Sequence, residues 1–291
     1  DEDRPALPLP PGKMPLRLGG CWRKRWRYVG AFDERVMLCA ASVRVGPLGQ
    51  TFWAVLDRSS GEVLEHTKQL LPAQRGEVWT ERGGGQEAWE LGSAGSRLRT
   101  RVDADGVSAK LAFADCGVWA ESICPNGEGG YVWTRKRPSW INLDLDLGER
   151  GRIRETLRGI EDESAGYHPR HTVWDWSAGV GTGADGRQVA WNLVQGVNDP
   201  DAGSERAIWI DGDDEPLEPG RVSFDGLDAV EFANGSRLTF EADAERRADE
   251  NRLVVRYSYR QPFGRFSGSL DGVPARLRGG CGCPGVGCAR D

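Results

Sequence analysis

The chain has 291 residues and a formal net charge of −6. This acidic balance argues against nucleic acid as a partner, because proteins that bind phosphate backbones usually carry a basic surplus. No run of about 18 apolar residues occurs, so we expect no membrane span. The chain begins at Asp1 without the charged-then-apolar pattern of a signal peptide. Four of its seven cysteines, Cys21, Cys39, Cys116 and Cys124, are predicted to be reduced thiols of a cytoplasmic protein.

Turn signals and alternating runs predict an all-β protein. Asp-Gly and Asn-Gly pairs such as Asp105-Gly106 recur along the chain, and they favour type I′ hairpin turns, in which both central residues need a positive φ. Short alternating runs lie between these turns. In one of them Ile141, Leu143 and Leu145 alternate with polar residues, which indicates a strand with one solvated face.

In chain order, the elements form a lead-in, two blocks of strands and a tail. Residues 1–15 are rich in proline and predict an extended lead-in. The first block, 16–160, has predicted strands at Trp26–Phe32, Val36–Val45, Thr51–Leu56, Glu62–His66, Arg97–Val102, Val107–Phe113, Gly130–Arg137 and Ile141–Leu147. The second block, 161–278, has them at Thr172–Ala178, Gln188–Val194, Ala207–Ile210, Val222–Phe224, Ala229–Phe232, Arg237–Ala242, Leu253–Tyr259 and Phe263–Leu270. Ala242–Asn251 has no apolar stripe and is predicted as a polar helical turn or loop, and 279–291 as an irregular Cys/Gly tail.

Four stretches of sequence carry a resemblance to a known family. They are Trp22–Tyr28, Tyr131–Arg137, Gly166–Trp176 and Gln261–Gly268. In these stretches the chain resembles the bacterial domain-of-unknown-function family 2804, over about residues 16–278. The resemblance implies two packed calycin-like (lipocalin-like) antiparallel β-barrels or sandwiches with very little helix. It also implies a remote similarity to carotenoid hydratases, kievitone hydratase and fungal pericyclases, but no activity, because a shared fold does not transfer chemistry.

The C-terminal tail departs from the family pattern. Members usually finish with an acidic, histidine-containing segment that ends near a tryptophan, whereas this chain has Cys281, Cys283 and Cys288 among glycines. A truncated or altered reading frame would produce such an ending. If the replaced segment helps to close the second barrel, we expect a less stable or inactive protein.

The densest group of polar residues precedes the strand of Trp174 and Trp176 and contains two of the three histidines. Histidine titrates near neutrality unaided, a neighbouring carboxylate can orient it, and an arginine can stabilise negative charge. The candidate catalytic residues are therefore Asp162, Tyr167, His168, Arg170 and His171. The alternative is structural, in which the histidines tie a crossover loop to the sheet by hydrogen bonds.

Aromatic residues with interleaved polar groups supply the candidate ligand-binding residues. Trp174 and Trp176 lie on one face of an extended strand, where they would wall a pocket. The full set is Trp174, Trp176, Trp133, Asn192, Arg23 and Arg135, the two arginines being candidates to meet a carboxylate or phosphate. The alternative reading is that the rings fill cores and the arginines pair with surface carboxylates.

Neither a metal nor a cofactor is predicted. His168 and His171 are three apart on a loop with Pro169, and the tail cysteines lack the paired spacing of structural zinc sites. We therefore expect a protein that binds a hydrophobic small molecule, lipid or isoprenoid-like, in a β-barrel cavity. The alternatives are a cofactor-free hydratase, isomerase or cyclase that uses the His/Tyr/Arg loop, and a structural or interaction module.

Overall fold

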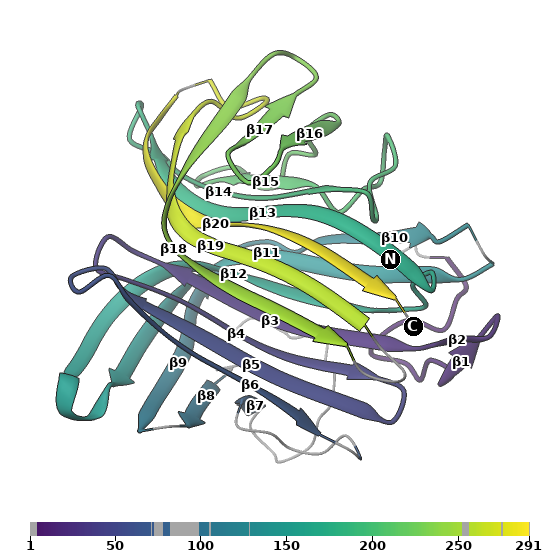
Figure 1. Ribbon diagram of the computed structural model, residues 1–291. Coiled ribbons are helices and arrows are strands. Elements are labelled where there is room, and N and C mark those ends of the chain that lie inside the picture. Colours follow the sequence, from purple (N-terminus) through teal and green to yellow (C-terminus); the bar gives the residue numbers. More distant parts are fainter. Residues whose placement is uncertain are drawn as a thin grey trace.

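The computed structural model describes residues 5–70, 72, 78–81, 99–104, 106–127, 129–251, 256–274 and 276–290. Apart from one 3-10 turn, η1 (Gly148–Arg150), the regular structure of these residues is β. Two large, curled antiparallel sheets pack on each other (Figure 1), which confirms the predicted fold class. Among the described residues, no helix is long and apolar enough to cross a membrane.

The first large sheet is built from the N-terminal strands. Its members are β3 (Lys24–Phe32), β4 (Val36–Val45), β5 (Leu48–Asp57), β6 (Glu62–Leu70), β7 (Val78–Glu81), β8 (Arg99–Ala104), β9 (Val107–Cys116), β10 (Ala120–Pro125), β11 (Tyr131–Asp146) and β12 (Arg152–Gly166). The order is β6-β5-β4-β3-β12-β11-β9-β8-β7, and β10 also pairs with β11. The short strands β1 (Arg17–Leu18) and β2 (Cys21–Trp22) form a separate pair. Alternation places one apolar core, with Val29, Leu38 and Ile141, on one face of this sheet.

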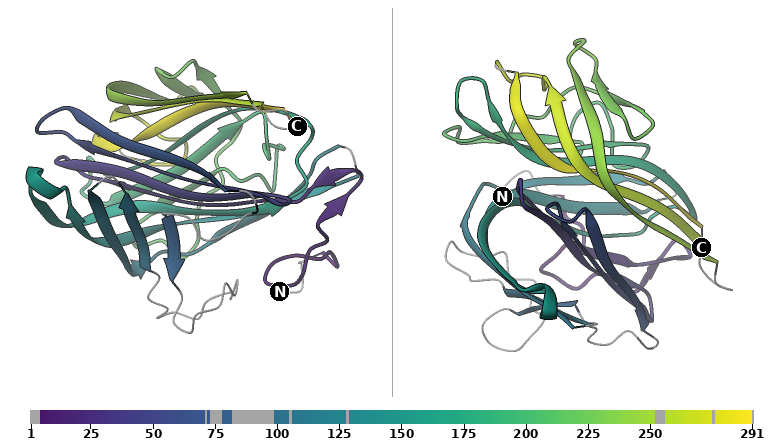
Figure 2. Two further views of the ribbon diagram at one scale, coloured as in Figure 1. Left: turned by 60° about the horizontal axis from the view of Figure 1, so that its bottom comes forward. Right: turned by 60° about the vertical axis from the view of Figure 1, so that its left-hand side comes forward.

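The second large sheet contains the remaining strands. They are β13 (His171–Gly183), β14 (Gln188–Gln195), β15 (Ala207–Ile210), β16 (Val222–Asp225), β17 (Ala229–Phe232), β18 (Arg237–Asn251), β19 (Arg256–Gly268) and β20 (Leu277–Arg290), in the order β15-β14-β13-β20-β19-β18-β17-β16. Figure 2 shows this sheet, green to yellow, lying across the first. Trp191 and Phe266 belong to its own apolar core.

A shared core joins the two sheets. Tyr28, Phe32 and Met37 of the first sheet lie in the same buried cluster as Trp176 and Phe263 of the second. The chain changes sheet after β12 ends at Gly166, six residues beyond the predicted boundary at residue 160. The division into two domains with the predicted bounds stays a prediction.

Two predictions for the C-terminal third are wrong. The tail is not irregular, because Leu277–Arg290 forms β20, which lies between β13 and β19 in the middle of its sheet. Arg237–Asn251 is one long strand, β18, because backbone pairing with β19 runs along it to Asn251 and overrides its helix-forming composition. The predicted strands Arg97–Val102 and Leu253–Tyr259 lie partly outside the described residues.

Candidate functional site

An aromatic cavity lies between the two sheets and has a volume of about 250 Å³. Its aromatic lining comes from β3, β5, β13 and β19, and consists of Trp26, Tyr28, Phe52, Trp174, Trp176, Tyr257 and Tyr259. Residues two apart on a strand share a face, so Trp174 and Trp176 both reach the cavity, and so do Trp26 and Tyr28 on the opposite wall. Trp176 meets Tyr28 edge to face, with ring centroids 5.4 Å apart.

Glycines in β20 make room for these rings. A Cβ atom on Gly287 would collide with the indole of Trp174, and one on Gly285 would lie 2.9 Å from the hydroxyl oxygen of Tyr259. Trp174 and Tyr259 stack with their ring centroids 6.4 Å apart. The glycines of the tail therefore let β20 pass beneath the wall of the cavity.

A buried group of charged residues borders the same cavity. Lys136 of β11 faces Asp162 of β12 in the strand register, and its Nζ lies 2.8 Å from Asp162 Oδ2 and 3.7 Å from Glu205 Oε1. Asn198 donates from Nδ2 to Glu205 Oε2 over 2.9 Å. Lys136 is 2% exposed and Asp162 8% exposed. We call Lys136, Asp162 and Glu205 the polar cluster.

The protonation of the polar cluster is set by burial and by its internal charges. Burial raises the pKa of Glu205 above its ordinary value, although Lys136 opposes this shift. Burial disfavours the charged form of Lys136, but Asp162 and Glu205 outweigh it and raise the pKa of the amine. Asp162 Oδ1 is buried and accepts no hydrogen bond from the described residues. The cluster therefore contains a charged amine, a carboxyl group with a raised pKa and a free acceptor atom.

His168 lines the cavity and its ring makes no hydrogen bond to another described residue. Burial lowers the pKa of His168 to about 3, and the positive charge of Lys24 makes a smaller contribution in the same direction. The sequence predicts a histidine that titrates near neutrality, whereas in this environment the ring stays neutral down to about pH 3. A neutral imidazole can donate or accept a hydrogen bond, but it has no extra proton to give.

The other predicted catalytic residues do not line the cavity. The Tyr167 hydroxyl donates to the carbonyl of Pro15 over 2.7 Å, and its ring packs against Tyr131 in a separate buried cluster. Arg170 is exposed. His171 is exposed at the start of β13, where Nε2 lies 3.4 Å from Cys288 Sγ. Of the predicted catalytic set, the structure brings only Asp162 and His168 to the cavity.

The predicted ligand-binding residues divide in a similar way, with Trp174 and Trp176 on the cavity wall. Asn192 lies behind that wall, where Oδ1 accepts from Trp176 Nε1 over 2.7 Å and Nδ2 donates to the Glu205 carbonyl over 2.9 Å. Trp133 donates instead to Glu121 over 2.8 Å. Arg135 is paired with Glu163, and Arg23 donates to the Met14 carbonyl, so neither arginine lines the cavity.

Sequence reasoning missed several charged residues of the site. Lys136 belongs to the stretch Tyr131–Arg137, but nothing local relates it to Glu205, because the two residues approach each other only through strand pairing and loop packing. Arg246 fell in the segment predicted as a helical turn or loop. In β18 it is 2% exposed, with its guanidinium carbon 4.2 Å from the ring centre of Phe52 and Nη2 donating to Thr67 over 3.0 Å. The alternation Ala242, Ala244, Arg246 is the signal that a strand reading would have used.

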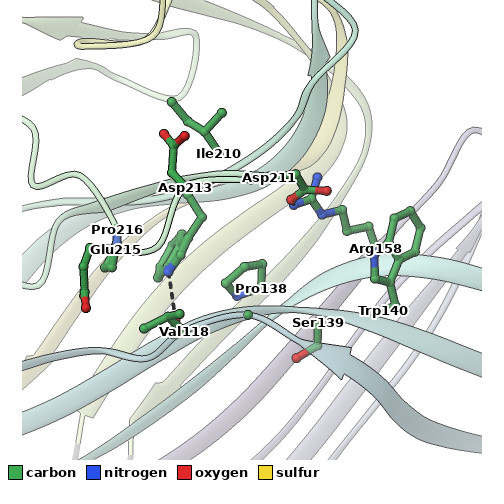
Figure 3. A pocket seen from close by; sticks show the side chains of 13 residues that line it. Val118, Pro138, Ser139, Trp140, Arg158, Ile210, Asp211, Asp213, Glu215 and Pro216 are labelled. Carbon is green, nitrogen blue, oxygen red and sulfur yellow. Dashed lines mark hydrogen bonds and ion pairs between the residues drawn. The ribbon is translucent and has the colours of Figure 1, made fainter.

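A second cavity, of about 210 Å³, lies at another margin between the sheets (Figure 3). Arg158 extends across it to form an ion pair with Asp211, near the ring of Trp140. Trp209 donates to the carbonyl of Val118 over 2.9 Å. None of the candidate catalytic or ligand-binding residues predicted from the sequence lines this cavity, and its interactions link one sheet to the other.

No group of three or more histidine, cysteine, aspartate or glutamate residues suited to a metal ion occurs within the described part of the chain. The polar cluster itself consists of one amine and two carboxylates.

Comparisons with known proteins agree with this fold. The model of the domain-of-unknown-function family 2804 matches residues 149–283, which confirms the resemblance there, whereas the first half of the chain lies outside the match. No curated protein matches the chain. Kievitone hydratase from Nectria haematococca is 13% identical, with 90% of this chain and 88% of that chain covered and a TM-score of 0.53. An AttH-like protein from Nitrosomonas europaea is also 13% identical, with 97% and 98% covered and a TM-score of 0.52. At these identities the likeness shows the fold alone.

Proposed function

We propose that this chain, whose residues 149–283 match a family of unknown function, binds a small hydrophobic molecule in the aromatic cavity. The observation that supports the proposal is the lining, in which seven aromatic rings from both sheets surround about 250 Å³. Apolar pockets with a few placed polar groups are typical of small-molecule sites. A lipid fragment, an isoprenoid or an aromatic compound would gain roughly 25 cal/mol for each Å² of apolar surface buried.

A second candidate function is a cofactor-free hydratase, isomerase or cyclase. The polar cluster favours it, because a buried carboxyl group of raised pKa beside a charged amine suits proton transfer to or from a bound substrate. In this version the polar cluster replaces the predicted loop of Tyr167, Arg170 and His171 as the source of acid–base groups. The cavity weighs against the third alternative, a structural module without a ligand.

Native mass spectrometry of the purified protein, before and after organic extraction, tests the binding proposal. We expect an added mass that disappears on extraction and returns when the extract is added back. Trp174→Ala, which opens the cavity wall, should lose most of the rebinding. Trp140→Ala is the matched control, because Trp140 lines the second cavity instead. Equal rebinding by both variants would place the ligand elsewhere.

The same experiment separates binding from catalysis. A ligand that leaves with its mass changed by one water, in the wild type but not in Lys136→Met, supports a hydratase. A ligand released unchanged after long incubation supports binding alone. A protein without added mass that also fails to bind any apolar probe contradicts both versions.

A further inference from the structure

We infer that the ligand of the aromatic cavity carries a hydroxyl group, phenolic or alcoholic, which binds between Asp162 and Lys136. This inference rests on the proposed function and names the chemical class of its ligand. It assigns to the polar cluster the role of recognising one O–H group at the end of an apolar body.

The strand register places the polar cluster directly beside the aromatic wall. Asp162 of β12 pairs on one side with Lys136 of β11 and on the other with Tyr28 of β3. Neighbouring strands are about 4.8 Å apart, so the carboxylate and the Tyr28 ring lie in adjacent positions of one row. A flat ligand that packs on Tyr28 and Trp176 would therefore present one end to Asp162.

Asp162 has an unused hydrogen-bond acceptor at this point. Its Oδ2 is held by Lys136, whereas its buried Oδ1 has no partner among the described residues. Buried carboxylate oxygens without a partner are uncommon, because water has been removed and nothing replaces its hydrogen bond. An O–H group of the ligand would supply the missing donor.

Lys136 complements this acceptor. An ammonium group has three N–H donors, and two carboxylates, of Asp162 and Glu205, lie within 3.7 Å of Nζ. A third donor remains for the ligand oxygen. A hydroxyl group can donate to Asp162 and accept from Lys136 at once, which a methyl ether, a carboxylate or an ammonium group cannot do.

The charges around the cavity agree with a neutral polar group. Two carboxylates in the polar cluster oppose a ligand carboxylate at that end. Lys136 itself opposes a ligand ammonium group, and Lys24, Arg25 and Arg246 line the rest of the cavity without further acidic residues. A neutral hydroxyl group meets neither penalty.

The surrounding contacts hold the hydroxyl site in place. Asn192 bonds both the Trp176 indole and the Glu205 backbone, so one amide orients an aromatic wall and an acidic residue together. The Tyr28 hydroxyl already accepts from Gln261 over 2.8 Å. The fold thus leaves the Asp162 acceptor available beside these rings.

Isothermal titration calorimetry with 2-naphthol, 2-methoxynaphthalene and naphthalene tests the inference. We expect the wild type to bind 2-naphthol about tenfold or more tightly than its methyl ether, because the ether lacks the donor. Asp162→Asn should reduce this preference several-fold. The double variant Lys136→Met/Asp162→Leu should abolish it, because both groups that would meet the ligand oxygen are removed. Asp211→Asn, at the second cavity, is the control and should keep the preference.

The outcomes distinguish this inference from the function on which it rests. Equal binding of the three probes to the wild type overturns the hydroxyl site and leaves an apolar binding cavity standing. Failure of all three to bind overturns the proposed cavity as well. Should the double variant not fold, the wild-type preference and its several-fold reduction in Asp162→Asn still decide the question.

Discussion

The strands β11 and β12 carry two buried ion pairs that are adjacent in sequence and lie on opposite faces of the first sheet. Arg135 donates from Nε and Nη2 to Glu163 Oε2, over 2.9 and 2.7 Å, and its guanidinium carbon lies 4.2 Å from the Trp119 ring centre. Arg27 approaches Glu163 from β3, with its Nε 3.4 Å from Oε1. Both carboxylate oxygens of Glu163 therefore have a basic partner.

The Lys136–Asp162 pair differs because it leaves one hydrogen-bond acceptor, Asp162 Oδ1, without a partner among the described residues. The pair also borders the aromatic cavity. Strand alternation thus places one of two neighbouring ion pairs within the sheet and the next on the wall of a cavity. A buried pair with all its acceptors used suits a structural role, whereas a buried pair with a free acceptor suits recognition.

The largest expected effect on stability comes from breaking the buried Arg135–Glu163 ion pair. Glu163→Gln leaves Arg135, which is 3% exposed, as a buried charge without its partner, and we expect a loss of about 3–5 kcal/mol of stability. Urea denaturation measures it. The control is Asp144→Asn on the same two strands, where the ion pair with Arg152 is exposed and should contribute little. Equal effects of the two variants would mean that the buried pair is not structural.

The charged residues on β12 also show where sequence reasoning reached its limit. Three predicted strands coincide with observed ones, because each has apolar residues that alternate or fill a buried run. They are Val36–Val45, Ala207–Ile210 and Ala229–Phe232. Arg152–Gly166 was not predicted, because its run of acidic residues, Glu161 to Glu163, makes sense only beside the basic residues of β11. Such complementarity between distant segments has no local period.

The candidate site could be predicted in part for the same reason. Trp174 and Trp176 followed from alternation along one strand, and His168 and Asp162 from a dense polar segment beside it. Lys136, Glu205 and Arg246 come from three other parts of the chain, which only the pairing and packing of the sheets bring to the cavity. The Cys/Gly tail lacked any strand signal, yet it pairs with strands on both sides, and its glycines fit beneath Trp174 and Tyr259.

The next largest effect is the contribution of His168, in the cavity, to the pH dependence of the free energy of unfolding. The folded state keeps His168 neutral down to about pH 3, whereas the unfolded chain takes up that proton near 6.5. Stability from this group is therefore present above 6.5 and is lost as the pH falls from 6.5 towards 3. Between pH 6.5 and about pH 5, the wild type should lose about 2 kcal/mol more than His168→Gln, in which this residue does not titrate.

Denaturation curves of both proteins at each pH measure this difference, and the titration of all other shared groups cancels in the comparison. Parallel pH profiles would mean that His168 is protonated as readily in the folded protein as in the unfolded chain. In that case the cavity end around Lys24 is wetter than its geometry indicates, and an imidazolium would again be available as an acid.

The smallest effect on stability is expected from substituting His171, three residues after His168. His171 is exposed at the start of β13, and its contact is with Cys288 Sγ at 3.4 Å. His171→Gln should change the free energy of unfolding by no more than about 0.5 kcal/mol, as exposed substitutions usually do, and its pH profile should follow the wild type. It should also bind 2-naphthol as the wild type does, because the residue does not line the cavity. A loss of binding in His171→Gln, with His168→Gln unaffected, would reverse the assignment and return the site to the outer end of β13.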